Sequence, residues 1–193
     1  PIVLFDRVAD GINCDKVVVD DFDSAYDATT HLIKLGSKKI ALLSTIHNLS
    51  VGKLRLDGYK KALSDANMSI DENLIIQETS IEDFDVQLQQ LISSKKMDAI
   101  FALDEHSSTM TMRMALKQGI KIPEELNIIG FADGVWSRRL TPSLSTVSQH
   151  APEIGAKAAE LLIHKLNSKD EFYQPQTVVI KTELRQREST RKL

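Results

Sequence analysis

Four polar residues and one aromatic residue are placed where they could build a binding site for a polar small molecule. Asp104, Asp133 and Gln149 each come two residues after a short apolar run of the kind that forms buried strands. Phe131 ends one of these runs, and Arg55 lies in the first turn of a helix predicted after another. Because open α/β sheets bind ligands at the carboxyl ends of their strands, we expect these side chains to line one rim. Guanidinium and carboxylate groups at such a rim suit a polyhydroxylated or otherwise polar ligand.

Each of these residues also has an interpretation that needs no ligand. Asp104 precedes a predicted helix, so its carboxylate could serve only as an N-cap. Asp133 and the following glycine could form only a turn, and Gln149 could satisfy only backbone groups. Arg55 has the strongest functional interpretation, since an arginine at a helix start is poorly placed for the helix dipole. The residues alone leave these alternatives open.

Strand and helix patterns alternate along the chain and must position these residues. Short apolar runs predict strands near residues 2–5, 17–19, 40–43, 74–76, 99–102, 127–131, 144–147 and 177–180. Between them, apolar residues recur at helical spacing, as in Ala25, Ala28, Leu32 and Leu35. Strand–helix alternation with short loops predicts an α/β fold with doubly wound parallel sheets. The polar tail from residue 185 onward is predicted to fray.

Composition excludes several classes of function. The 24 Lys and Arg residues are outnumbered by 27 Asp and Glu, so the chain lacks the basic excess that phosphate neutralisation requires. No apolar run approaches the roughly 20 residues that a membrane-spanning helix needs, and no signal peptide is visible. The single cysteine, Cys14, cannot form an internal disulfide, and we interpret it as a reduced thiol of a cytoplasmic protein.

Catalytic and cofactor motifs are missing from the sequence. It contains no G-x-G-x-x-G or G-x-x-x-x-G-K-[ST] phosphate loop, no G-x-S-x-G elbow and no H-E-x-x-H metal pair. The adjacent acids Asp20 and Asp21 are better interpreted as helix-capping residues at a strand end than as a phospho-acceptor pair. We therefore expect no enzyme activity, no cofactor and no metal site.

Four segments resemble, in order and spacing, the lactose/galactose-repressor (LacI/GalR) family of bacterial transcriptional regulators. They are HLIKLGSKKIALL (31–43), RLDGYKKAL (55–63), GIKIPEELNIIGFAD (119–133) and TPSLSTVSQHAPEIGAKAAELL (141–162). The matching stretches extend over nearly the whole chain, and their combination is specific to the family.

The resemblance implies a periplasmic-binding-protein-like fold of type I, in which two lobes hold an effector between them. It implies a complete C-terminal lobe, and an N-terminal lobe that lacks its first half and the helix-turn-helix head. The expected parts are the end of the N-terminal lobe (1–19), the C-terminal effector-binding lobe (20–148), a crossover with a helix returning to the N-terminal lobe (149–175), and the last strand of the C-terminal lobe with the tail (176–193).

The resemblance also implies function and partners. We expect an effector-sensing domain of a cytoplasmic repressor that responds to a sugar or sugar derivative, with a nucleobase as the weaker alternative. We expect a homodimer that binds operator DNA only through the head absent from this sequence. Residues 105–118 and 136–140 are the expected dimer contacts, although Met110, Met112 and Met114 could equally be core.

The chain departs from the family pattern at several effector positions. Leu103 stands where members often have Asn, and Ala132 stands where they often have a ligand-binding Asp. An aromatic residue that stacks on the ligand in some members would fall near Ser80, with Phe84 as the nearest substitute. Arg55 and Asp104 match the family residues directly, and Asp133 matches only by adjacency.

Two other classes of protein share this kind of fold. A periplasmic sugar-binding protein of a transporter or chemoreceptor has the same two lobes, so the fold cannot separate it from a regulator. A nucleotide-dependent enzyme on a doubly wound sheet is the third alternative, and the lack of a glycine-rich loop argues against it.

Overall fold

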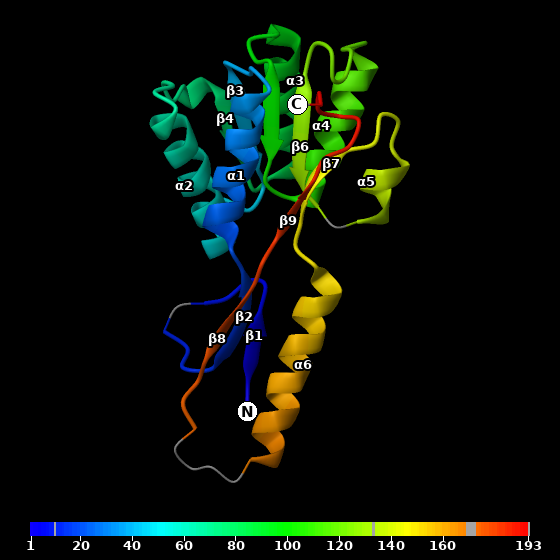
Figure 1. Ribbon diagram of the computed structural model, residues 1–193. Helices are drawn as coiled ribbons and strands as arrows, with labels where there is room; N and C mark the ends of the chain where they lie inside the picture. Colours follow the sequence, from blue (N-terminus) through cyan, green and yellow to red (C-terminus); the bar gives the residue numbers. More distant parts are fainter. Residues whose placement is uncertain (10, 133, 169–172, 193) are drawn as a thin grey trace.

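Two separate sheets organise the chain into a large and a small lobe (Figure 1). The computed structural model describes residues 1–9, 11–132, 134–168 and 173–192. The large sheet has the order β4-β3-β5-β6-β7-β9, in which only β9 is antiparallel to its neighbour. Its strands are β3 (Ile40–Ser44), β4 (Ile75–Gln77), β5 (Ala99–Ala102), β6 (Asn127–Phe131), β7 (Ser145–Ser148) and β9 (Glu183–Arg185).

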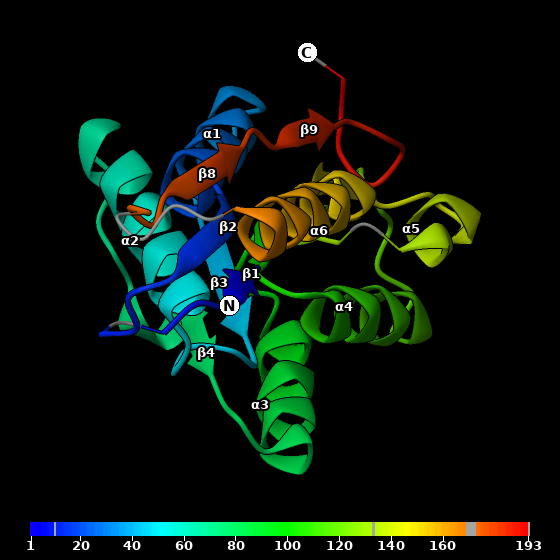
Figure 2. The same cartoon turned by 90° about the horizontal axis from the view of Figure 1, so that it is seen from below.

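Helices cover both faces of the large sheet, as Figure 2 shows. One face packs against α1 (Asp21–Lys34) and α2 (Ser50–Asp65), and the other packs against α3 (Ile81–Ser94) and α4 (Glu105–Lys117). A one-turn helix, η1 (Glu72–Leu74), precedes β4, and α5 (Val135–Arg139) follows β6. This arrangement confirms the predicted α/β architecture with parallel strands.

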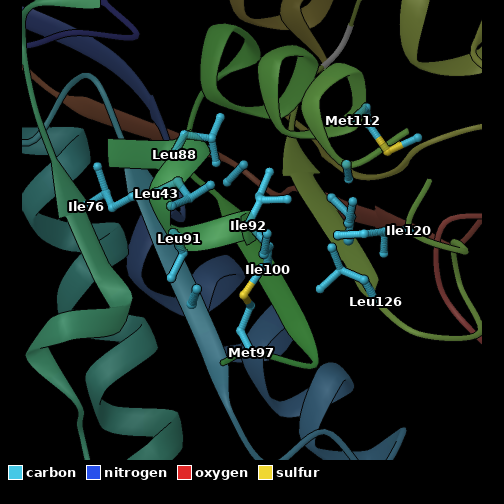
Figure 3. Packing of buried hydrophobic residues seen from close by; sticks show 14 of the residues in the cluster. Leu43, Ile76, Leu88, Leu91, Ile92, Met97, Ile100, Met112, Ile120 and Leu126 are labelled. Carbon is cyan, nitrogen blue, oxygen red and sulfur yellow. The ribbon is translucent and has the colours of Figure 1, made fainter. Parts of the chain in front are cut away.

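The central strands β3 and β5 of the large sheet are almost wholly apolar because both of their faces are buried. Successive side chains of a strand point to opposite faces, so Ile100 joins one core cluster and Phe101 joins the other. Figure 3 shows the first cluster, where Leu43 and Ile100 of the sheet meet Leu88 and Ile92 of α3. The two clusters fix the sheet edge from which the site residues project.

The small lobe consists of the three-stranded parallel sheet β1-β2-β8 and one long helix. Its elements are β1 (Val3–Phe5), β2 (Asp15–Val19), β8 (Thr177–Ile180) and α6 (Ala151–Asn167). The helix packs on one face of the sheet, where Val17, Val19 and Ile180 contact Ile154 and Leu161 in a single small cluster. Three connections join the lobes: β2 to α1, β7 to α6, and β8 to β9 (Figure 1).

The last part of the chain differs from the sequence expectation in two ways. Residues 177–180 were assigned to the C-terminal lobe, but β8 pairs in parallel with β2 of the small sheet, and only β9 beyond it pairs with β7. The apolar run marks a strand without specifying its partner, and Ile180 finds its apolar neighbours in the small lobe.

The tail is ordered rather than frayed. Ser189 is fully buried, and its hydroxyl donates to the carbonyl of Ile128 at 2.6 Å while the N–H of Ser145 donates to that hydroxyl at 2.8 Å. Backbone bonds from Ile128 N to Ser189 O and from Ser189 N to the carbonyl of Ser143 complete the attachment. Polar residues therefore anchor this tail through hydrogen bonds that a hydropathy pattern does not reveal.

Candidate effector-binding site

A cavity of about 240 Å³ lies where the carboxyl ends of both sheets face each other. Four of the five predicted site residues line it, namely Arg55, Asp104, Phe131 and Gln149. The fifth, Asp133, lies outside the described residues. The remaining lining residues are Asp6, Arg7, Ile46, Val51, Glu105, Ala132 and Ala151.

Arg55 is the most constrained charged group of the cavity. The helix α2 begins at Ser50, so Arg55 lies in its second turn. The sequence pattern predicts Arg55 in the first turn. Its Nε donates to Asp21 Oδ1 at 2.7 Å, its Nη1 donates to the Leu103 carbonyl at 2.6 Å, and its guanidinium lies 3.4 Å from the centroid of the Phe131 ring. Among the described residues these bonds use two of its five N–H donors, so donors remain for a ligand.

The ion pair between Arg55 and Asp21 is almost completely buried, with 3% and 2% of the two side chains exposed. Burial raises the pKa of the Asp21 carboxyl above its ordinary value, and the Arg55 guanidinium opposes this shift only in part. Breaking a buried pair leaves an uncompensated charge, which costs about 3–5 kcal/mol. Arg55 is therefore held in one orientation before any ligand arrives.

Asp104 serves as the N-cap of α4 in a full capping box. Its Oδ1 accepts from the N–H of Ser107 at 2.8 Å, and its Oδ2 accepts from the N–H of Thr45 at 2.9 Å. The capping interpretation is thus confirmed, and the second bond ties the loop after β3 to the start of α4. Both oxygens already accept hydrogen bonds, so any contact with a ligand would use their remaining lone pairs.

Phe131 and Gln149 come from the ends of β6 and β7. The Phe131 ring is 1% exposed and forms the floor under Arg55. Gln149 lies in the connection from β7 to α6, next to His150, whose φ of 54° turns the chain into the small lobe. These two residues bring a flat apolar surface and an amide to the same cavity.

The structure adds residues that the sequence prediction omitted. Asp6 and Arg7 follow β1 and bring a carboxylate and a guanidinium from the small lobe, and Glu105 begins α4. The signal for Asp6 and Arg7 was present, since they follow a short apolar run as the other site residues do. Across the described residues, no group of three or more His, Cys, Asp or Glu is placed to hold a metal ion.

Phe84 does not replace the missing stacking aromatic. Its side chain is fully buried in the core between the large sheet and α3, where its ring packs edge-on against His106 with centroids 5.8 Å apart. Helical periodicity places Phe84 on the same face as Leu88 and Leu91, and this face points into the core.

The fold agrees with comparisons to known proteins. The family model of the periplasmic binding protein-like domain matches residues 29–190, so the chain belongs to this family. Its relatives are LacI-type transcriptional regulators. The ribose operon repressor of Haemophilus influenzae is 32% identical over 178 residues, which are 90% of this chain and 53% of the relative. The HTH-type transcriptional regulator DegA of Bacillus subtilis is 33% identical over 158 residues, which are 81% of this chain and 47% of the relative.

A solved structure of a LacI family regulator from Enterococcus faecium with bound ribose superposes with a TM-score of 0.88 at 25% identity. The alignment covers 100% of this chain and 72% of that chain. The chain spans about half the length of the curated relatives it matches. In the described part of the chain, no helix is long and apolar enough to cross a membrane.

Proposed function

We propose that this chain is the effector-sensing domain of a LacI-type transcriptional regulator and that the effector binds in the cavity between the lobes. The observation that carries this proposal is the convergence of Arg55, Phe131 and Gln149 of the large lobe with Asp6 and Arg7 of the small lobe. A ligand held by both lobes stabilises the arrangement in which they approach each other. Binding can therefore change the lobe geometry.

A sugar or sugar derivative is the effector class that we propose. The cavity combines hydrogen-bonding groups with the apolar side chains of Ile46, Val51 and Ala132, which is how proteins hold ligands that are polyhydroxylated at the edge and apolar on the face. Support comes from the ribose operon repressor among the relatives and from the ribose-bound regulator among the structures. The absence of an Asn at Leu103 and of an Asp at Ala132 predicts a different hydroxyl pattern from that of members with both residues.

The regulatory mechanism follows from a shift in populations. An effector that binds two lobe arrangements with different affinity changes their ratio, and only one arrangement presents two DNA-binding heads at operator spacing. We propose that such a head precedes this domain in a cytoplasmic regulator, as the name of the HTH-type relative DegA suggests. The domain itself carries no basic excess for binding DNA.

We propose a homodimer that uses α4 and α5. Trp136 is 67% exposed and Val135 is 50% exposed on α5, while Met110 and Met114 on α4 are only partly buried. Met112 is fully buried in the core, so of the three methionines of α4 only Met110 and Met114 are available for the proposed dimer contact. The alternative of a periplasmic sugar-binding protein of a transporter is not supported, because the relatives are transcriptional regulators.

The experiment is a thermal-shift panel of sugars, sugar phosphates and nucleobases on the intact protein. A ligand of the native state raises the melting temperature with saturation. We expect Arg7→Ala and Gln149→Ala to weaken this shift, whereas Lys34→Ala, at the exposed C-terminal end of α1, should leave it unchanged. If no compound shifts the melt, or if both site variants respond like the wild type, the effector site lies elsewhere.

A further inference from the structure

The buried partner of Arg55 is also the first residue after a lobe connection. Asp21 begins α1, immediately after the chain leaves β2 of the small lobe. Its carboxylate is almost fully buried, and it is not among the residues that line the cavity. The ion pair between Arg55 Nε and Asp21 Oδ1, at 2.7 Å, therefore joins the proposed effector cavity to the connection between β2 and α1.

The neighbouring residue joins two of the three lobe connections. Asp20 Oδ1 accepts the N–H of Thr182 at 2.9 Å, and Asp20 Oδ2 lies 3.1 Å from the ammonium of Lys181. Thr182 and Lys181 form the link between β8 and β9. The Asp20 carboxylate therefore joins the first connection (β2 to α1) to the third (β8 to β9). The Asp20 side chain is only 11% exposed, so water competes weakly for these bonds.

These contacts form a continuous path. It runs from the cavity through the Arg55 guanidinium to Asp21, along one peptide unit to Asp20, and across to the backbone of Thr182. Asp20 and Asp21 lie at the start of α1, and Asp20 O accepts the N–H of Ser24 in the first turn, so the two carboxylates cannot move independently. A displacement at one end of such a path must be accommodated at the other end or break a buried pair.

We propose that Asp21 is a positioning residue that holds Arg55 toward the cavity and transmits effector binding to the lobe connections. The proposal rests on the proposed function, because it requires that an effector accept hydrogen bonds from Arg55. When a ligand oxygen takes the free donors of Arg55, the guanidinium shifts over the Phe131 ring. Asp21 follows because a separated Asp21 would be left buried without a counter-charge. The start of α1 then moves together with the link at Lys181 and Thr182.

Hydrogen exchange of the Thr182 amide measures this link, because that N–H donates to Asp20. In the intact protein we expect Asp21→Asn to speed exchange in residues 181–183 about five- to tenfold, which is the lower end of the range of allosteric couplings. Amides of β5, in the centre of the large sheet, should keep their wild-type rates, whereas a merely destabilised variant would exchange faster in both places. The matched control is Asp27→Asn, which makes the same change of charge at an exposed position of the same helix.

D-ribose serves as the probe for the ligand-dependent part. Saturating D-ribose should slow exchange in residues 181–183 of the wild type and of Asp27→Asn, but not in Asp21→Asn. Calorimetry should show weaker binding in Asp21→Asn and partial recovery in Asp21→Glu, which restores the carboxylate. The proposal is overturned if Asp21→Asn matches Asp27→Asn in both exchange and ribose response.

The experiments distinguish a failure of the proposed function from a failure of the proposed role of Asp21. If wild-type protein does not bind D-ribose, the choice of sugar is wrong, while the ribose-free exchange rates of Asp21→Asn against Asp27→Asn still decide whether the path exists. If Asp21→Asn does not fold, Arg55→Lys removes the Nε–H that donates to Asp21 and must give the same local increase in exchange. The proposal is overturned if amides 181–183 of Arg55→Lys exchange at the same rates as in the wild-type protein.

Discussion

The two lobes use the same strand and helix types but differ in how completely their sheets are covered. The large sheet has helices on both faces and two apolar clusters, whereas the small sheet has one helix, one face in contact with it and one cluster. Phe5 and Val179 of the small sheet remain 55% and 50% exposed. The comparison teaches that the large lobe carries most of the buried apolar surface of this chain, while the small lobe supplies few contacts beyond its half of the cavity.

The largest expected effect comes from the core of the large lobe. Ile100→Ala removes a fully buried aliphatic side chain from the middle of the large sheet and should lower the free energy of unfolding by about 4–5 kcal/mol, the upper part of the range for this substitution. The matched small-lobe change, Ile154→Ala, should cost about 2 kcal/mol, because its cluster is smaller and can collapse around the gap. Urea unfolding measures both, and equal losses would show that the small lobe is packed as tightly as the large one.

A second effect concerns the contact between α1 and α2. A Cβ on Gly58 would lie 2.3 Å from the backbone carbonyl oxygen of Phe22, so the two helices would have to separate. Gly58→Ala should therefore destabilise the protein by about 1–3 kcal/mol despite the better helix propensity of alanine. Thermal denaturation followed by circular dichroism provides the measurement, and a stabilised variant would contradict the close approach.

The same substitution should have the opposite sign in the small lobe. Gly155 lies on the exposed side of α6, and nothing lies within 4 Å of the position of an added Cβ. Gly155→Ala should stabilise the protein by about 0.5–1 kcal/mol through helix propensity alone. Melting temperatures of Gly155→Ala and Gly58→Ala, measured together, test whether the packing around each helix explains the opposite signs.

The smallest effect concerns the pH dependence of the contacts that Asp20 makes with Lys181 and Thr182. Burial by itself would raise the pKa of Asp20, but the N–H of Thr182 and the ammonium of Lys181 outweigh it and hold the pKa below the ordinary 3.8. A lowered carboxyl pKa contributes stability that is present above the ordinary value and is lost as the pH falls through the folded value. Exchange in residues 181–183 should therefore accelerate only below about pH 4, and Asp20→Asn should remove this acid dependence.

Much of the fold and part of the site were predictable from the sequence, because both rest on local patterns. Uninterrupted apolar strands such as Ile40–Ser44 mark a sheet covered on both faces, and the residues just after such strands form the rim. Asp104, Phe131 and Gln149 lie at or just after strand ends and line one cavity, together with Arg55 from the helix after β3. Asp6 and Arg7 follow the apolar run of β1 and line the same cavity.

Other features could not be predicted, because they depend on contacts between distant segments. The run 177–180 has the composition of any strand, and only its packing against Ile154 and Val17 assigns it to the small sheet. The polar composition of the tail predicts fraying. In the structure, Ser189 forms hydrogen bonds with residues at the start of β6 and β7.

The sequence by itself determined the α/β class, the order of strands and helices, the family resemblance and most of the cavity rim. The periodicity of burial and the residues that begin and end each element are local properties, and they are written in adjacent positions. Only the tertiary structure decided that Asp21 pairs with Arg55 and that Asp20 binds the backbone at Thr182. These partners are separated by 34 and 162 residues, and their pairing depends on how the two lobes pack and exclude water.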